Sequence, residues 1–98
     1  MILKLEADGK IIGSIRTKCI DHTICVGKLM VHPEYRRQGL GRKLLLEVEK
    51  LMPGYRYELF TSTLSKNNLR LYESVGYTEY KRERINDFLT FVYLEKMT

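Results

Sequence analysis

The feature that most constrains the fold is a change of hydrophobic period near the middle of the chain. Residues 23–31 read TICVGKLMV, an apolar stretch that ends before Pro33 because proline cannot continue a strand ladder. Apolar residues then recur at helical spacing, at Leu40, Leu44, Leu45, Val48 and Leu51. The next stretch, YRYELFTS, is typical of a strand. The pattern predicts a strand at 23–31, a helix at 40–52 and a strand at 55–62, joined by a right-handed crossover that makes the two strands parallel.

The flanking segments predict further strands and one more helix. Asp8-Gly9 is a strong hairpin turn between alternating apolar runs, and Asp21-His22 is a second turn. The expected elements are strands at about 2–7 and 10–18, a short helix at 66–75 and a terminal hairpin of 77–84 and 89–96. We therefore expect one α+β domain over residues 1–98, with a mixed sheet in the order β-β-β-α-β-α-β-β.

Composition limits the class of protein. A chain of 98 residues fits one small core, and no apolar run approaches the roughly 20 residues of a membrane helix. The first ten residues, MILKLEADGK, read as a strand rather than a secretion leader, so we expect a cytoplasmic protein with no membrane partner. Cys19 and Cys25 are expected to be reduced thiols, and no Cys/His spacing suits zinc, so no metal site is predicted.

The segment RRQGLG, residues 36–41, has the chemistry of a phosphate-binding loop. Its glycines, Gly39 and Gly41, leave room for a ligand, and the N–H groups of residues 38–42 can converge on an anion at the helix start. Basic residues crowd this end, where a helix normally favours acidic ones. The sequence lacks a P-loop, and Leu44 stands where a dinucleotide fingerprint needs its third glycine. A flexible loop with solvated arginines is the alternative interpretation.

Two motifs together resemble the GNAT superfamily of N-acetyltransferases. The stretch LMVHPEYRRQGLGRKLL is similar to its acyl-coenzyme A loop, [Q/R]-x-x-G-x-[G/A] after a strand, with Arg36, Gly39 and Gly41 at the defined positions. The stretch SKNNLRLYESVGY, residues 65–77, resembles the later N-x-x-x-Y motif on a short helix, with Asn68 and Tyr72. The motifs occur in the family's order, separated by one helix and one strand.

The resemblance implies acetyl-coenzyme A as co-substrate and assigns residues to it. In the family, the strand before the loop separates from its parallel neighbour, and the pantetheine arm pairs with its backbone, while the pyrophosphate meets loop amides. An arginine among Arg36, Arg37 and Arg42 could also reach the 3′-phosphate. The implied cofactor-binding residues are Leu29, Met30, Val31, Arg36, Arg37, Gln38, Gly39, Leu40, Gly41, Arg42, Asn68 and Tyr72.

The resemblance also implies a catalytic acid but leaves the base open. Tyr72 takes the place of the residue that protonates the departing thiolate; the alternative is a tyrosine that only packs in the core. Some family members carry a glutamate on the strand before the loop, which falls near Cys25 here, and residues 23–31 contain no acid. A water relayed by backbone carbonyls is the default base.

The function that follows is direct transfer of an acetyl group to a primary amine of a small molecule or peptide. The alternative is a coenzyme A-binding module or regulatory partner without catalysis. The net charge of +5 also suits nucleic acid, but KRER, residues 81–84, lies on a strand where alternate residues point apart. No aromatic stacking platform adjoins the glycines, so nucleic acid is not the expected partner.

The resemblance covers only the cofactor half of the family fold, which normally opens with another strand and two helices. We therefore expect either a naturally reduced domain or a missing front end. The strand at 2–7 would be an open edge, which invites pairing, so a homodimer that buries this region is predicted, with the terminal strand as a candidate interface. That strand has two apolar faces, as for burial on both sides: Phe88, Thr90, Val92 and Leu94 on one, Leu89, Phe91, Tyr93 and Glu95 on the other.

Overall fold

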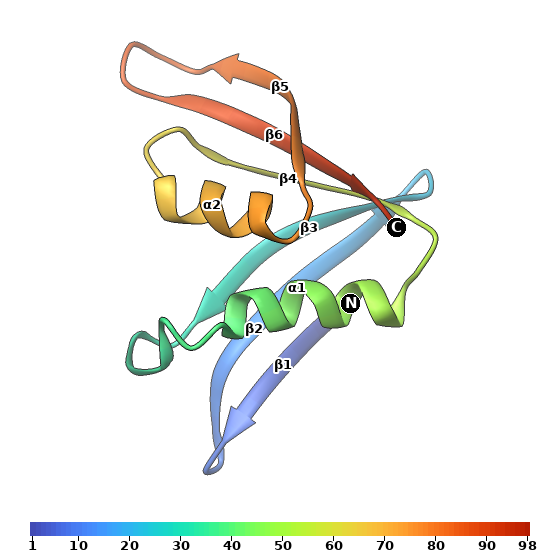
Figure 1. Ribbon diagram of the computed structural model, residues 1–98, viewed down its shortest axis with the longest axis vertical. Helices are drawn as coiled ribbons and strands as arrows, with labels where there is room; N and C mark the ends of the chain where they lie inside the picture. Colours follow the sequence, from blue (N-terminus) through green and yellow to red (C-terminus); the bar gives the residue numbers. More distant parts are fainter.

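The computed structural model describes residues 1–98 as a six-stranded sheet with two helices (Figure 1). The strands are β1 (Ile2–Ala7), β2 (Lys10–Ile20), β3 (Thr23–Val31), β4 (Arg56–Ser62), β5 (Thr78–Arg84) and β6 (Thr90–Met97). The helices are α1 (Leu40–Leu51) and α2 (Lys66–Ser74), with a 3-10 turn at Pro33–Tyr35. Neither helix is long and apolar enough to cross a membrane. The α+β class and the order of elements are confirmed.

The sheet has the strand order β1-β2-β3-β4-β6-β5. Only β3 and β4 pair in parallel, which confirms the crossover through α1, and every other pair is antiparallel. β1 forms one edge, as predicted, and β5 forms the other. β6 lies inside the sheet, so it offers no free backbone edge to a second chain.

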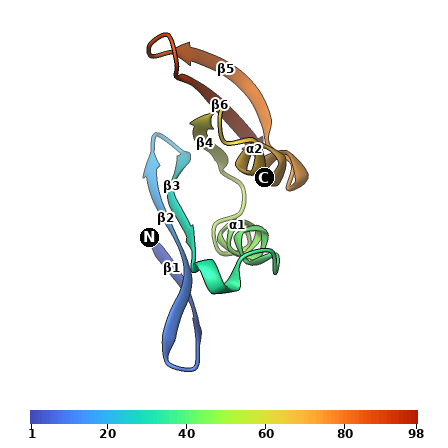
Figure 2. The ribbon, with the colours of Figure 1, turned by 90° about the vertical axis from the view of Figure 1, so that its left-hand side faces the viewer.

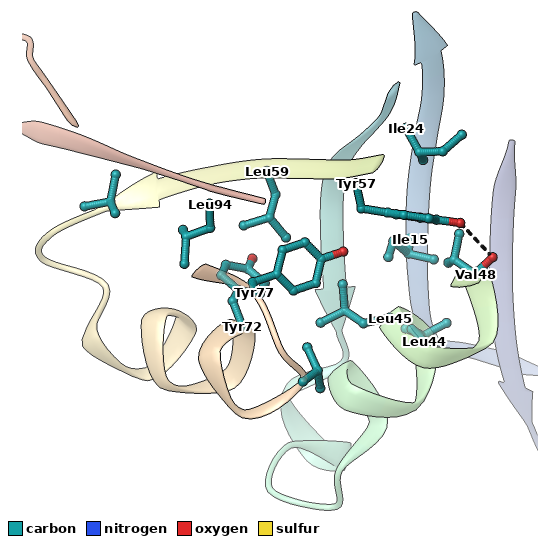
Figure 3. Close-up of a cluster of buried hydrophobic side chains, with 12 residues drawn as sticks. Ile15, Ile24, Leu44, Leu45, Val48, Tyr57, Leu59, Tyr72, Tyr77 and Leu94 are labelled. Atoms are coloured by element: carbon teal, nitrogen blue, oxygen red, sulfur yellow. Dashed lines mark hydrogen bonds between the residues drawn. The ribbon is translucent and has the colours of Figure 1, made fainter. Parts of the chain in front are cut away.

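Both helices cover the same face of the sheet, as the turned view shows (Figure 2). The core between them contains Leu44, Leu45 and Val48 of α1, each no more than 1% exposed, against side chains of β2, β3, β4 and β6 (Figure 3). The Tyr57 hydroxyl donates to the carbonyls of Val48 at 3.2 Å and Met52 at 2.7 Å, which ties the end of α1 to β4. The opposite face carries no helix.

The strand boundaries differ from the prediction mainly at the end of β2. We expected this strand to end near residue 18, but it continues to Ile20. Asp21 and His22 both adopt positive φ, 48° and 63°, so they form a two-residue turn that lets pairing run to the hairpin tip.

The expectation that the terminal strand is buried on two sides is wrong for one side. Val92 and Leu94 are fully buried beneath the helices. Phe91 and Tyr93 point to the face without helices and are only half-buried. Phe88 is not part of the strand; it lies in the β5–β6 turn and is 87% exposed. Alternation alone cannot reveal that one face of the sheet lacks a covering layer.

Candidate active site

The site is organised by the separation of β3 from β4. These strands pair only over Thr23–Cys25 and Arg56–Glu58, although β3 continues to Val31 and β4 to Ser62. In Figure 1 they start side by side near the C-terminus and diverge toward the β3–α1 loop. Beyond Cys25 the β4-facing backbone groups of β3 therefore have no strand partner and can bond an extended ligand.

A bulge accompanies this separation. The β2–β3 register shifts because Ser14 pairs with Met30 whereas Arg16 pairs with Gly27, which places one extra residue in β3. Of the predicted pantetheine-binding residues, Leu29 packs against the core, Met30 is 60% exposed and Val31 pairs with Gly13. All of them lie on the separated part of β3, beside the gap.

The β3–α1 loop turns by means of two left-handed residues. Arg37 has φ 65° and Gly39, the N-cap of α1, has φ 74°. Glycine adopts such a φ without strain, and a Cβ atom at Gly39 would meet nothing within 4 Å, so the backbone there is open to a ligand. Arg36, Arg37, Gln38, Gly39 and Arg42 are exposed, whereas Leu40 and Gly41 are half-buried.

The amides of residues 37–42 are unpaired. No backbone carbonyl and no side chain accepts a hydrogen bond from them; the first bond of the helix end is Lys43 N–H to the Gly39 carbonyl at 3.0 Å. The first turn of α1 has no acidic residue and no side-chain cap. Arg36, Arg37 and Arg42 form no ion pairs. Free N–H groups, the positive end of a helix and unpaired arginines are the features with which proteins bind anions.

The packing around Gly41 also favours a residue without a side chain. A Cβ atom there would lie 3.2 Å from Leu71 Cδ2 and 3.7 Å from Leu29 Cδ2. Its lack of a side chain lets α2 and β3 approach the start of α1 closely. We predicted that Gly41 serves the approach of a ligand; the structure adds that it also brings the Tyr72 helix against this loop.

Tyr72 is buried, 8% exposed, with its ring edge-on to that of Tyr77 at a centroid distance of 6.2 Å (Figure 3). Its hydroxyl has no hydrogen-bond partner in the protein, so the core does not need that group. Burial raises the pKa of the Tyr72 phenol, which keeps the proton on the oxygen near neutral pH. A phenol in this state can donate a proton.

Asn68 lies one helical turn before Tyr72, yet its environment differs. Whereas Tyr72 is buried, Asn68 is exposed and lines a shallow hollow of about 330 Å³ at the start of α2. The two residues are four apart on α2, but only Tyr72 is covered by the core.

Sequence reasoning missed Glu58. This residue is the last of β4 to pair with β3, opposite Cys25, and the Cys25 thiol donates to its Oε1 at 3.5 Å. Arg56 Nη1 at 2.6 Å and the Tyr80 hydroxyl at 3.2 Å donate to its Oε2. The position we compared with the family's glutamate, Cys25, therefore has a carboxylate beside it from the neighbouring strand. Alternation in RYELFTS was the available signal, because it puts Glu58 opposite the buried face.

The hydrogen bond from Arg56 holds the pKa of the Glu58 carboxyl below its usual range, although partial burial opposes this shift. The group is therefore ionised at neutral pH. Burial and Glu58 in turn raise the pKa of the Cys25 thiol, which stays protonated. No disulfide is present. At the last paired position of β3 and β4, Glu58 is thus an ionised carboxylate and Cys25 a neutral thiol.

Known structures share this architecture. The ribosomal-protein-S18-alanine N-acetyltransferase from Escherichia coli superposes with a TM-score of 0.88 at 23% identity, over 97% of this chain and 66% of that one. An N-acetyltransferase from Staphylococcus aureus Mu50 gives 0.85 at 16% identity, over 97% of this chain and 69% of that one. A GNAT family acetyltransferase from Elizabethkingia anophelis with acetyl-CoA bound gives 0.87 at 19% identity, over 99% of this chain and 75% of that one. At these identities the likeness shows the fold.

The chain thus spans between two thirds and three quarters of the length of these solved proteins. A family model described as an acetyltransferase (GNAT) domain matches residues 2–79, which include the separated strands, the loop of unpaired amides and the Tyr72 helix. Because that match extends over most of the sequence, the chain belongs to the GNAT acetyltransferase family.

Proposed function

We propose that the protein transfers an acetyl group from acetyl-coenzyme A directly to a primary amine. The observation that carries the proposal is the set of unpaired amides at residues 37–42, which follow the separated end of β3. A diphosphate satisfies several converging N–H groups at once, and the gap between the strands accepts an extended arm.

The residues fit the co-substrate along its length. The amides of 37–42 would hold the pyrophosphate, with Arg36, Arg37 or Arg42 on the 3′-phosphate. The backbone groups of residues 29–31 that face β4, which have no strand partner on that side, would bond the pantetheine arm. Asn68, exposed at the start of α2, would contact the cofactor from the other side of the gap. Acetyl-coenzyme A supplies an activated acyl group as a thioester.

Two side chains would handle the protons of the transfer. As the acceptor nitrogen bonds to the acetyl carbon and the carbon–sulfur bond breaks, Tyr72 gives its proton to the leaving thiolate. Glu58 accepts a hydrogen bond from the amine, stabilises the positive charge on its nitrogen and passes the released proton to water. A low pKa makes Glu58 a weak base, so orientation and electrostatic stabilisation are its larger contributions.

Calorimetry with acetyl-coenzyme A, followed by a thiol-release assay with a panel of amines, tests the proposal. We expect amine-dependent thiol release and binding with a dissociation constant on the order of 1–100 μM, within the range of ordinary KM values. Binding without thiol release for any amine would favour the second candidate, a coenzyme A-binding module. Absence of binding would contradict both.

We further propose a homodimer that pairs through an edge of the sheet. β1 and β5 are the edges available for pairing, because β6 is internal, and the edge that we predicted to pair is β1. Alternating exposed residues on β1 include Ile2, which is 50% exposed. Light scattering of the purified protein tests this proposal. One chain has a mass of 11.6 kDa, so a particle of twice that mass is expected, and a particle with the mass of one chain would contradict the dimer.

A further inference from the structure

A hollow of about 410 Å³ opens on the helix-free face of the sheet, where β3 and β4 separate. One wall comes from Arg16 and Lys18 of β2, and the other from Glu58 and Phe60 of β4 with Tyr93 of β6. Gly27 lies between the walls. A Cβ atom there would meet only the Arg16 carbonyl oxygen, at 3.6 Å, so the absent side chain leaves space for a ligand. The volume suits a small molecule.

The positive and negative side chains of this hollow lie on opposite walls. Lys18 pairs in register with Cys25, and Cys25 with Glu58, so the three side chains form a row across one face of the sheet. At normal strand spacing the ends of this row are roughly 10 Å apart, too far for an ion pair. Glu58 is already bonded by Arg56, whereas Arg16 and Lys18 form no ion pair or side-chain hydrogen bond. The β2 wall therefore has positive charge available.

The wall opposite Arg16 is aromatic. Phe60 is 54% exposed, and its ring centroid lies 5.0 Å from that of Phe91 and 5.5 Å from that of Tyr93. The rings of Phe91 and Tyr93 are half-buried and tilted by 43° and 33° against that of Phe60. Together they form an apolar surface on which a ring or aliphatic chain of a ligand loses contact with water.

We infer that the acceptor is an amine that also carries an acidic group and an apolar side group, as an aromatic amino acid does. The inference rests on the proposed function and names its substrate class. The amine lies beside Glu58 at the gap, the carboxylate or phosphate lies toward Arg16 and Lys18, and the apolar group covers Phe60 and Tyr93. A polycation is a poor acceptor, because the β2 wall repels its further charges.

Matched acceptors test the role of each group. Phenylalanine, its neutral amide and phenethylamine share the ring and the amine but differ in the acidic group; phosphoserine tests phosphate, and spermine is the polycation. We expect kcat/KM for phenylalanine to exceed that for phenethylamine by about tenfold, the effect of one or two exposed ion pairs. A larger value for phosphoserine, which carries no apolar side group, than for phenylalanine would contradict the apolar contact with Phe60 and Tyr93.

The variant R16Q/K18Q removes the positive wall. It should bring the phenylalanine-to-phenethylamine ratio to near one and leave acetyl-coenzyme A binding unchanged. The control K4Q/K10Q removes the same charge outside the hollow and should keep the ratio. Gly27→Val should fill the hollow and raise KM for every acceptor, whereas Gly27→Ala, whose added atom has only ordinary contacts, should have a smaller effect.

Other outcomes separate the inference about the acceptor from the proposed acetyl transfer. If phenethylamine or spermine reacts as well as phenylalanine, or if R16Q/K18Q keeps the ratio, the inference fails while acetyl-coenzyme A binding and thiol release still stand. If the protein binds acetyl-coenzyme A but releases no thiol, the inference is tested by binding of the same acceptors to the protein–coenzyme A complex. NMR shifts of the Cys25 and Gly27 amides report this binding. Tighter binding of phenylalanine than of phenethylamine or spermine would support the inference, and any other order would contradict it. Absence of acetyl-coenzyme A binding would overturn both.

Discussion

The two faces of the sheet were formed by the same alternating strands, yet they differ in almost every physical respect. Under the helices, Tyr57, Leu59, Val92 and Leu94 are at most 4% exposed. On the other face, the neighbouring positions of β4 and β6 carry ion pairs and half-exposed aromatic rings. The comparison suggests that the covered face supplies stability and the open face supplies chemistry.

The largest effect should come from the covered face. Leu45→Ala removes a side chain that is 1% exposed, and we expect it to lower the free energy of unfolding by about 2–5 kcal/mol through lost burial and the cavity left behind. Phe60→Ala on the open face, where the ring is 54% exposed, should lower it by about 1 kcal/mol or less. Urea unfolding of both variants measures the contrast. Equal losses would show that the open face is covered in solution.

Tyr72 is an exception to this division between the faces, because it is buried on the covered face and yet has a proposed chemical role. Tyr72→Phe keeps the ring but removes a hydroxyl that has no partner in the protein, so stability should hardly change. We expect kcat for thiol release to fall by about 100-fold, the lower range for a general acid, with acetyl-coenzyme A affinity unchanged. Steady-state kinetics and calorimetry separate these quantities. An unchanged kcat would assign Tyr72 to packing alone.

The loop arginines belong to neither face of the sheet, because they follow the carboxyl end of β3 in the loop and the first turn of α1. Replacing Arg37 and Arg42 by Gln should weaken acetyl-coenzyme A binding by about tenfold and reduce its salt dependence, because each exposed charge contributes modestly to phosphate binding. Affinity measured across a salt series gives both quantities. K4Q/K10Q, with the same loss of charge on strands β1 and β2 away from the loop, is the control; an equal loss of affinity there would indicate a general charge effect.

The smallest effect concerns Glu58 and pH. Its carboxyl pKa is lowered in the folded protein, first by the hydrogen bond from Arg56, so the contribution to stability is present above the unfolded pKa and is lost as the pH falls through the folded pKa. The group is about one third exposed, which limits the effect to about 1 kcal/mol or less. Unfolding of wild type and Glu58→Gln at pH 7 and in acid tests this. A difference that persists in acid would contradict it.

The fold was largely predictable because its signals are local. Apolar spacing in α1, the turn at Asp8-Gly9 and the parallel crossover all follow from residues close in sequence, and the boundaries of β1 and β3 were predicted as observed. The extension of β2 to Ile20 depended on left-handed φ at two non-glycine residues, which sequence does not specify strongly.

The site was predictable only where a motif lies on one continuous segment. The loop around Gly39 and the Tyr72 helix are such segments. Glu58 was missed because its role depends on register: β3 and β4 are joined through α1, and only their pairing brings Glu58 beside Cys25. The exposure of Phe60 and Tyr93 was missed for a similar reason, since alternation cannot tell which face of a sheet a helix will cover.

The central claim is that the amides of residues 37–42 bind a diphosphate. Isothermal titration with acetyl-coenzyme A and with dephospho-coenzyme A, which keeps the diphosphate but lacks the 3′-phosphate, tests it most directly. We expect both to bind, with dephospho-coenzyme A weaker by no more than about tenfold. Gly39→Ala, strained at its φ of 74°, should weaken both. No detectable binding of either ligand to the folded protein would contradict the account.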